Sequence, residues 1–226
     1  METLEDATEQ KHLSVPCSYE THKRRKHMII KNFVLTGGPC GGKTTAIEKI
    51  KEVYGGRGYT VLTMSETATD LINGGIAPWT CGTNCDFQSI ILKLQLQREE
   101  AYHYAATTMK TDKVIILYDR GAMDNRGYMN SEEYAKALRF AGVTEQELLD
   151  RYDAIFHMET AAKNKDESAY STANNTARYE TREQAIKVDD NILDAWKDHS
   201  HRYIIKNAPT IEAKIDELIN KIDGLL

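Results

Sequence analysis

FVLTGGPCGGKTT, residues 33–45, is an apolar strand sequence that runs into the pattern Gly-x-x-x-x-Gly-Lys-Thr. Glycines allow a tight turn in which several backbone N–H groups point inward, and the positive N-terminal dipole of the next helix adds to them. In this pattern Lys43 reaches the β and γ phosphates of a nucleotide, and the hydroxyl of Thr44 binds Mg²⁺. The stretch therefore predicts a phosphate-binding loop between a strand and a helix.

The residues on both sides of the loop support this interpretation. Residues 45–53 have apolar side chains at helical spacing, so a helix is expected directly after the loop. An ordinary glycine-rich turn is the alternative, and the flanking strand and helix argue against it. The residues predicted to bind the nucleotide here are Gly37, Gly38, Pro39, Cys40, Gly41, Gly42, Lys43, Thr44 and Thr45.

Length and composition limit the class of protein. The chain has 226 residues, of which 41% are hydrophobic, so it can bury one substantial core. A net charge of -5 argues against a broad basic face for nucleic acid, and we expect no nucleic-acid partner. The longest apolar runs are strand-sized, and the acidic start of the chain differs from a secretory signal. We expect no transmembrane segment and a cytoplasmic protein.

The four cysteines do not predict a disulfide framework. Cys40 lies inside the phosphate-binding loop, where a disulfide would hinder the ligand. Cys81 and Cys85 have the spacing of half a zinc site, but no second Cys or His pair with fitting spacing accompanies them. Reduced thiols are the default interpretation, with metal binding as the alternative.

Residues 1–27 differ from the rest of the chain. They lack hydrophobic periodicity and change from acidic to basic, ending in HKRRKH at residues 22–27. We interpret them as a flexible leader before a P-loop kinase-like domain at residues 28–226. A solvated charge run is the plain interpretation of the basic cluster, and contact with an acidic lipid or a targeting role is the alternative.

From residue 29 onward, strand and helix patterns alternate. The apolar run at residues 113–118 is continuous, which indicates a strand buried on both faces, as in a parallel sheet covered by helices. The alternation predicts an α/β fold with a doubly wound sheet that binds its ligands at the carboxyl ends of the strands. The expected strands are 29–36, 60–64, 113–118, 153–158 and 201–206, and the expected helices are 43–54, 68–72, 86–109, two that begin at Ser131 and Thr144, 178–198 and 211–222.

Two acidic residues follow predicted strands and should meet the phosphate-binding loop at one edge of the sheet. Asp119 ends the apolar strand at 113–118, as a carboxylate that holds Mg²⁺ directly or through water should; a helix-capping role is the alternative. Glu66 follows the strand at 60–64, and we expect it to bind an acceptor hydroxyl or to act as general base. Its alternative role is that of an acid favoured at a helix N-terminus.

Two neighbours of Asp119 are weaker candidates for the same pocket. Arg120 is placed to neutralise an acceptor or a transferred phosphate, with a surface ion pair as the alternative. Asp124 is a candidate for binding the acceptor, with a plain turn residue as the alternative.

A long polar stretch at residues 160–177 predicts a lid, for which we take bounds of about 160–184. Arg178 and Arg182 follow it, four residues apart on one face of a predicted helix, where they can close over the triphosphate and stabilise transition-state charge. Their alternative partners are the surface acids Glu180 and Glu183. Asn207, just after the fifth strand, is predicted to contact the nucleotide base, with a capped helix start as the alternative.

Four blocks of sequence carry a resemblance to a known family. They are LTGGPCGGKTT at 35–45, SETAT at 65–69, YDRGAMD at 118–124, and a softer block from Arg178 to Asn207. Over residues 29–226 the chain resembles the P-loop AAA-type family of the bacterial ribosylnicotinamide-kinase domain and the animal TRP-channel translocation-defect proteins. The resemblance implies a nucleoside-kinase-like three-layer sandwich with a five-stranded parallel sheet and a helical lid, which binds ATP or GTP with Mg²⁺.

Two functions of different classes fit these residues. The first is a phosphotransferase that moves the γ-phosphate of ATP or GTP to a hydroxyl of a small acceptor such as a nucleoside; Glu66 and the lid favour it. The second is a nucleotide-dependent binding or lipid-interacting module with slow NTPase activity, which the basic leader favours. A Ras-like GTPase is disfavoured, because residues 119–121 lack the Asp-x-x-Gly spacing.

Overall fold

A computed structural model describes residues 28–164 and 181–226 of the chain. The predicted leader at residues 1–27, Arg178 and the larger part of the predicted lid lie outside the described residues.

The fold is built on a sheet of five parallel strands in the order β2-β3-β1-β4-β5. The phosphate-binding loop follows the central strand, β1, which pairs with β3 on one side and β4 on the other. In this register Leu35 lies opposite Asp119, so the loop and Asp119 leave the sheet at the same edge. The strands span Ile29–Thr36 (β1), Thr60–Met64 (β2), Lys113–Asp119 (β3), Ala154–Met158 (β4) and Arg202–Ile205 (β5), and they confirm the five predicted ones.

The helices occupy most of the predicted positions, with short 3-10 helices added at η2 and η3. Thr144 and Glu147 form the expected capping box, whereas the helix predicted to open at Ser131 is capped by Asn130 together with Glu133. The helices span Lys43–Gly56 (α1), Thr67–Asn73 (α2), Asn84–Thr108 (α3), Ala122–Tyr128 (η2), Ser131–Ala141 (α4), Glu145–Leu149 (α5), Ala161–Lys163 (η3), Arg182–Ala195 (α6) and Ile211–Asp223 (α7).

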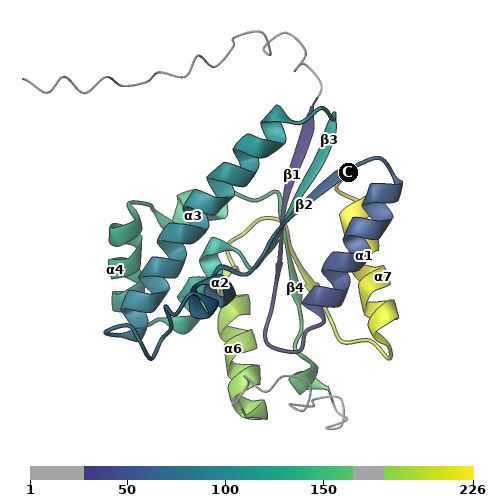
Figure 1. The fold of residues 1–226 in the computed structure, drawn as a ribbon. Coiled ribbons are helices and arrows are strands. Elements are labelled where there is room, and N and C mark those ends of the chain that lie inside the picture. The colour runs from purple at the N-terminus through teal and green to yellow at the C-terminus, as the bar shows by residue number, and fades with distance from the viewer. Residues whose placement is uncertain (1–27, 165–180) are drawn as a thin grey trace, which may run out of the picture.

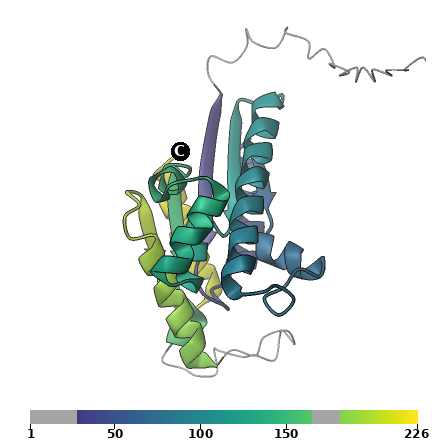
Figure 2. The same cartoon turned by 90° about the vertical axis from the view of Figure 1, so that its left-hand side faces the viewer.

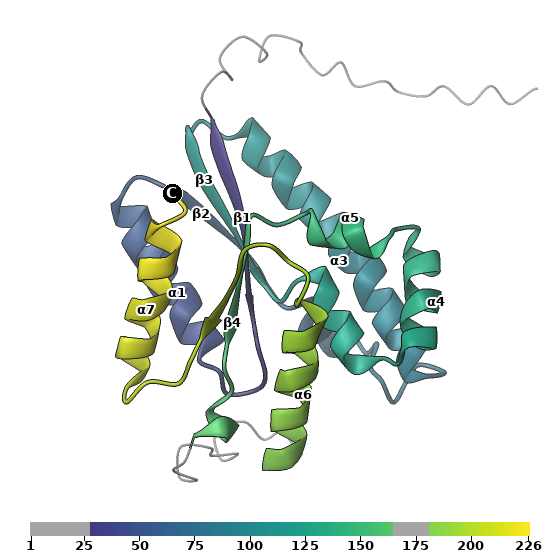
Figure 3. The ribbon, with the colours of Figure 1, turned by 180° about the vertical axis from the view of Figure 1, so that it is seen from behind.

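Helices cover the sheet on both faces. α1 and α7 lie side by side on one face, and α3, α4 and α6 lie on the other (Figures 1 and 3). Figure 2 views the molecule from the side of the second layer, with these helices in front of the sheet. The α/β sandwich predicted from the sequence is therefore confirmed.

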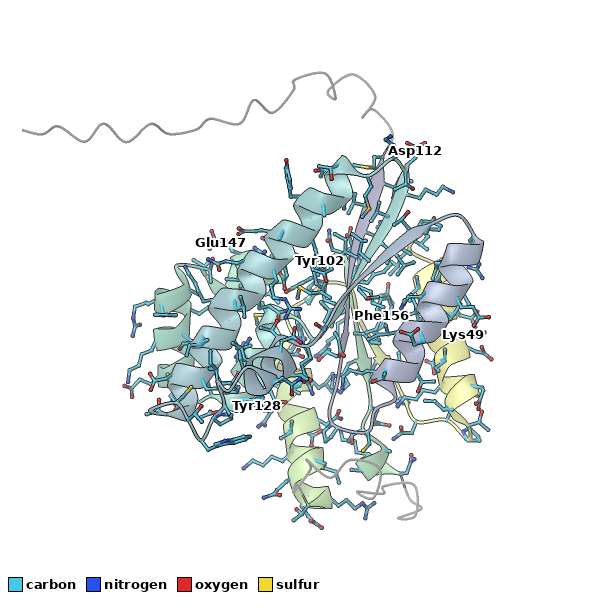
Figure 4. The ribbon with its side chains drawn as sticks, in the orientation of Figure 1. Lys49, Tyr102, Asp112, Tyr128, Glu147 and Phe156 are labelled. Carbon is cyan, nitrogen blue, oxygen red and sulfur yellow. The ribbon has the colours of Figure 1, made fainter. Side chains whose placement is uncertain are left out.

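Alternate side chains of the strands enter two separate cores. Phe33 and Phe156 pack with α1 and α7 on one face, while Val34 and Ile116 pack with α3, α4 and α6 on the other. In Figure 4 Phe156 lies within the sheet, whereas Lys49 lies on the outer side of α1. Burial on both faces explains the continuous apolar run of β3, since neither set of side chains meets water.

In the part of the chain that the structure describes, no helix combines the length and apolar character needed to cross a membrane. Cys81 and Cys85 are both free thiols.

Candidate functional site

The loop after β1, residues 37–42, is called the phosphate loop here, and it lies tightly against the end of β4. Gly37 has φ +128°, and a Cβ built there would lie 2.2 Å from the carbonyl oxygen of Met158. Cys40 adopts φ 57° and Gly42 φ 87°, so the loop winds back on itself before α1 begins. Only glycine fits at Gly37, because both its backbone conformation and the neighbouring backbone exclude a side chain.

The N-terminus of α1 is open to an anion. Gly42 occupies the N-cap position and has no side chain to cap the helix, and the first turn of α1, all of it described, carries no acidic residue. Thr44 and Thr45 are exposed in this turn. The helix dipole and the unsatisfied N–H groups are therefore left to bind negative charge, as predicted for the phosphates.

Lys43 interacts electrostatically with the other charged residues of the site. Its Nζ donates to the carbonyl oxygens of Gly37 and Gly38, both at 3.3 Å. Burial and the charge of Arg120 lower the pKa of Lys43 to about 8, against the opposing effect of Asp119, Glu66 and Asp124. The structure therefore brings these sequence-predicted residues within electrostatic reach of one lysine.

Asp119 is the last residue of β3, and one of its carboxylate oxygens makes no hydrogen bond to the described residues. Within the described part of the chain, its Oδ1 is buried and has no hydrogen-bond partner. Burial raises the pKa of Asp119, and the positive charge of Lys43 opposes that rise. A buried carboxylate oxygen without a hydrogen-bond partner, beside a phosphate loop, is suited to a cation or to its bound water.

Glu66 and Arg120 form an ion pair between the Nε of Arg120 and the Oε1 of Glu66. The pair is mostly buried, with side-chain exposures of 16% for Arg120 and 30% for Glu66, so it is no surface ion pair. The hydroxyl of Thr69 donates to Glu66 Oε2 at 2.8 Å, and Arg120 Nη1 donates to the Gly37 carbonyl at 3.2 Å. Burial alone would raise the pKa of Glu66, but Arg120, Thr69 and Lys43 together lower it.

Asp124 contacts Arg120 of this pair and connects three elements of the fold. Its carboxylate accepts hydrogen bonds from Thr36 Oγ1 at 2.6 Å and from Trp196 Nε1 at 2.5 Å. Arg120 Nη1 lies 3.5 Å from the same carboxylate, whose side chain is 4% exposed. Asp124 therefore joins β1, η2 and the end of α6, a structural role beside the acceptor contact predicted for it.

Side chains of α3 hold the turn at residues 119–122 by hydrogen bonds. Gln95 Nε2 donates to the Arg120 carbonyl and to Glu99 Oε1, both at 3.0 Å. The hydroxyl of Tyr152 donates to Glu99 at 2.6 Å and accepts from the Ala122 amide at 2.8 Å. This buried network, which was not predicted from the sequence, fixes the backbone that carries Asp119 and Arg120.

The lid arginine that the structure describes is directed at the β4–α6 connection. Arg182 donates from Nε to the Ala162 carbonyl and from Nη2 to the Asn164 carbonyl, each at 2.8 Å. Its predicted closure over the triphosphate stays a prediction. The prediction that one helix carries both arginines is wrong, because α6 begins at Arg182 with Thr181 as its N-cap. Arg178 itself lies outside the described residues.

Asn207 uses its side chain within the protein. Its Nδ2 donates to the Thr160 carbonyl at 2.9 Å, and its Oδ1 accepts from Lys214 at 3.0 Å. Its backbone N–H donates to Glu159 at 3.1 Å. These bonds place Asn207 at the ends of β4 and β5, and contact with the nucleotide base stays a prediction.

Two buried charges that the sequence analysis did not single out hold the phosphate loop. Asp189 of α6 accepts the N–H of Gly38 at 2.7 Å and lies 2.7 Å from Lys163 Nζ and 3.1 Å from His157 Nε2. Burial alone would raise the pKa of Asp189, but His157, Lys163 and the Gly38 amide lower it to about 2. Lys214 of α7 holds the loop from the other face of the sheet and donates to the Gly41 carbonyl at 3.0 Å.

Both charges interrupt an apolar stripe of their helix, with Asp189 between Ala185 and Ile192 and Lys214 beside Ile215 and Leu218. A charge at a core-facing position is the sequence signal that points to such residues.

Comparison with known protein families agrees with this geometry. A family model described as an AAA domain matches residues 32–214, from within β1 to within α7. The chain belongs to the AAA-domain family. This AAA domain is thus a P-loop domain of a nucleotide-binding class. No curated protein matches the sequence at a significant level.

The residues of the AAA domain fit a magnesium ion. The Thr44 hydroxyl and the Asp119 carboxylate are hard oxygen ligands, which suit Mg²⁺. Among the described residues no group of three His, Cys, Asp or Glu forms a self-contained metal site. Mg²⁺ in a P-loop enzyme needs no such group, because substrate phosphates and water complete its coordination.

Proposed function

We propose that the AAA domain is a phosphotransferase that moves the γ-phosphate of ATP or GTP to a hydroxyl of a small acceptor such as a nucleoside. The observation that carries this proposal is the position of Glu66. Its carboxylate is fixed by Arg120 beside the phosphate loop and interacts electrostatically with Lys43, although it belongs to neither the loop nor β3. A domain that only held a nucleotide would not need this additional oriented carboxylate.

The donor side of the reaction is assigned to the phosphate loop. The inward N–H groups and Lys43 bind the β and γ phosphates and stabilise the charge on the transferring group. Thr44 and Asp119 are the residues that would hold Mg²⁺, which supplies charge neutralisation between the β and γ phosphates. Arg178 and Arg182 are proposed to add positive charge from the lid.

The acceptor side is assigned to Glu66, with Arg120 and Asp124 as its supports. Both oxygens of Glu66 already accept a hydrogen bond, and each keeps a second lone pair for an acceptor hydroxyl. In the transfer, the hydroxyl oxygen forms a bond to the γ-phosphorus, the bond to the bridging oxygen breaks, and the hydroxyl proton passes to Glu66. The lowered pKa of Glu66 keeps it ionised and suits a loose transition state, in which orientation counts for more than strong basicity.

The test uses the full chain with Mg²⁺ and γ-labelled ATP or GTP. A panel of nucleosides, sugars and lipid head groups is added, and labelled product is separated from free phosphate. We expect one class of acceptor to collect the label. Release of phosphate at the same rate with and without every acceptor would contradict the kinase proposal.

That contrary result would favour the second candidate, a nucleotide-dependent binding or lipid-interacting module with slow NTPase activity. The sequence feature behind it, the basic leader, lies outside the described residues. No contact of the described residues favours it over phosphotransfer.

A further inference from the structure

We propose that Lys214 is a positioning residue of the phosphate loop, which turns the Gly41–Gly42 peptide so that its N–H faces the phosphates. The proposal rests on the phosphate binding assigned above. It does not depend on whether the phosphate is then transferred.

Lys214 is buried and donates three hydrogen bonds within the protein. The residue is 4% exposed, and its Nζ donates to the carbonyl oxygens of Gly41 at 3.0 Å and Glu159 at 2.6 Å. The third bond goes to Asn207 Oδ1 at 3.0 Å. An ammonium group has three N–H donors, so Lys214 uses all of them within the protein.

The geometry of the peptide bond carries the inference. A trans peptide is planar, with its C=O and N–H pointing in opposite directions. The described chain has no cis peptide, so the Gly42 N–H points away from Lys214 when the Gly41 carbonyl points toward it. The proposal therefore places the phosphates on the side of the Gly41–Gly42 peptide that is opposite to Lys214.

A free loop would not hold this orientation by itself. Gly41 and Gly42 are adjacent glycines, and glycine rotates more freely than any other residue. A Cβ at Gly41 would lie 2.7 Å from the Met158 carbonyl, so a stiffer residue cannot replace the glycine. The bond from Lys214 supplies the constraint that the sequence of the loop lacks.

The same ammonium joins the phosphate loop to the other strand ends. Glu159 follows β4 and Asn207 follows β5, so Lys214 connects three loops at the carboxyl edge of the sheet. Burial of such a group is costly: it lowers the pKa of Lys214 to about 8, against the charges of Glu159 and Asp189. A lysine used only for packing would be better replaced by an apolar residue.

The test compares Lys214→Met with Lys221→Met, an exposed lysine of the same helix. The full chain is titrated with tripolyphosphate, which probes the loop without a base or sugar. We expect Lys214→Met to bind tripolyphosphate about 10- to 100-fold more weakly, the range of hydrogen bonds to a charged donor. Lys221→Met should bind like the wild type.

Glycine-selective ¹⁵N labelling supplies a readout that a merely structural role would not change. In the wild type the Gly42 amide signal should shift on binding, because its proton forms a hydrogen bond to a phosphate oxygen. In folded Lys214→Met that shift should be lost, while the signals of distant glycines such as Gly142 stay in place. A folded Lys214→Met that binds tripolyphosphate within about twofold of the wild type, about 0.4 kcal/mol, would overturn the proposal.

If Lys214→Met does not fold, Lys214→Gln is measured in the same way, since its uncharged amide ends one bond short of the lysine nitrogen and should lose the bond to the Gly41 carbonyl. Wild-type affinity in Lys214→Gln, with no rearranged Gly42 signal, would overturn the proposal, and so would loss of folding in both variants. A wild type that binds tripolyphosphate but phosphorylates no acceptor would contradict the kinase proposal alone.

Discussion

Lys43 is charged only over part of the accessible pH range, because burial lowers its pKa to about 8. Below that pH its ammonium donates to the carbonyls of Gly37 and Gly38, two neutral acceptors that phosphate oxygens can replace. Above that pH the side chain is neutral and loses its attraction for phosphate. Lys214, with a pKa of about 8, titrates in the same range and in the same direction.

Nucleotide affinity should therefore fall as the pH rises through about 8. The expected limit is about a tenfold loss per pH unit for each proton linked to binding. Calorimetric titration with ATP or GTP measures this loss of affinity. The terminal phosphate is already ionised in this pH range, so its own titration does not contribute to the change. Lys43→Met should bind weakly and lose the part of the pH dependence that Lys43 contributes; an affinity that rose with pH in the wild type would contradict this assignment.

Glu66→Gln separates nucleotide binding from phosphotransfer. The amide keeps the shape of the side chain but cannot take a proton, so transfer to the acceptor should fall by about 10²- to 10⁴-fold. Nucleotide affinity should change little at a pH well below 8, where Lys43 stays charged without the help of Glu66. Glu100→Gln, at an exposed position of α3, is the control, and equal transfer rates in the two variants would remove Glu66 from the mechanism.

At the scale of elements, the buried carboxylate of Asp189 joins α6 to the phosphate loop. Asp189 accepts the Gly38 amide, and a Cβ at Gly38 would lie 2.9 Å from the Cβ of Asp189. The absence of a side chain at Gly38 is what lets the helix approach so closely. Trp196, just past the end of α6, adds a second attachment through its bond to Asp124.

Asp189→Asn should destabilise the protein by about 1–3 kcal/mol at neutral pH, since Lys163 and His157 lose a buried charged partner. The adjacent Asp190→Asn is a matched control: Asp190 also lies 2.7 Å from Lys163, but its side chain is 59% exposed. Its loss should cost less than about 0.5 kcal/mol. Urea unfolding measures both, and equal losses would contradict the role given to Asp189.

The pKa of Asp189 predicts how the difference in stability between these variants depends on pH. Its pKa is lowered from 3.8 to about 2 in the folded protein. The stability that its charge contributes is therefore complete above pH 3.8 and is lost as the pH falls through about 2. The difference between wild type and Asp189→Asn should shrink over that window.

Gly121 controls the contact between β3, η2 and the end of α6. A Cβ there would lie 2.7 Å from the Trp196 ring and 2.9 Å from Val34, so Gly121→Ala should cost about 1–3 kcal/mol through overpacking. Gly55, inside α1, has nothing within 4 Å of such a Cβ. Gly55→Ala should instead stabilise the protein by about 0.5–1 kcal/mol. Unfolding measurements that gave both variants the same sign would contradict the packing described at Gly121.

The elements that the sequence predicts well are those whose signal is local. β3 is a continuous apolar run, β1 ends in the apolar residues that precede the phosphate loop, and α5 carries its Thr144–Glu147 capping box within four residues. The 3-10 helix η2 has no such signal, because tertiary bonds such as that from Trp196 to Asp124 shape it. Asp189 and Lys214 were missed for the same reason: their partners in the phosphate loop lie 151 and 173 residues away in the chain.

For the whole molecule, the strand order explains why the site forms where it does. The chain passes from β1 to β2 on one side of the sheet and later to β4 and β5 on the other side. The loops after β1 and β3 therefore meet at the centre of the carboxyl edge, where the direction of winding reverses. The alternation of strands and helices predicted this class of fold and the meeting of Glu66 and Asp119, but it did not specify the order of the strands.

The fate of the γ-phosphate in H₂¹⁸O tests the central claim most directly. The wild-type chain is incubated with Mg²⁺, ATP or GTP and a pool of small hydroxyl compounds, and the phosphorylated products are analysed by mass spectrometry. Phosphotransfer predicts a phosphorylated acceptor without ¹⁸O, formed faster than ¹⁸O-labelled inorganic phosphate. Only ¹⁸O-labelled phosphate, in the same amount with and without the pool, would contradict the account.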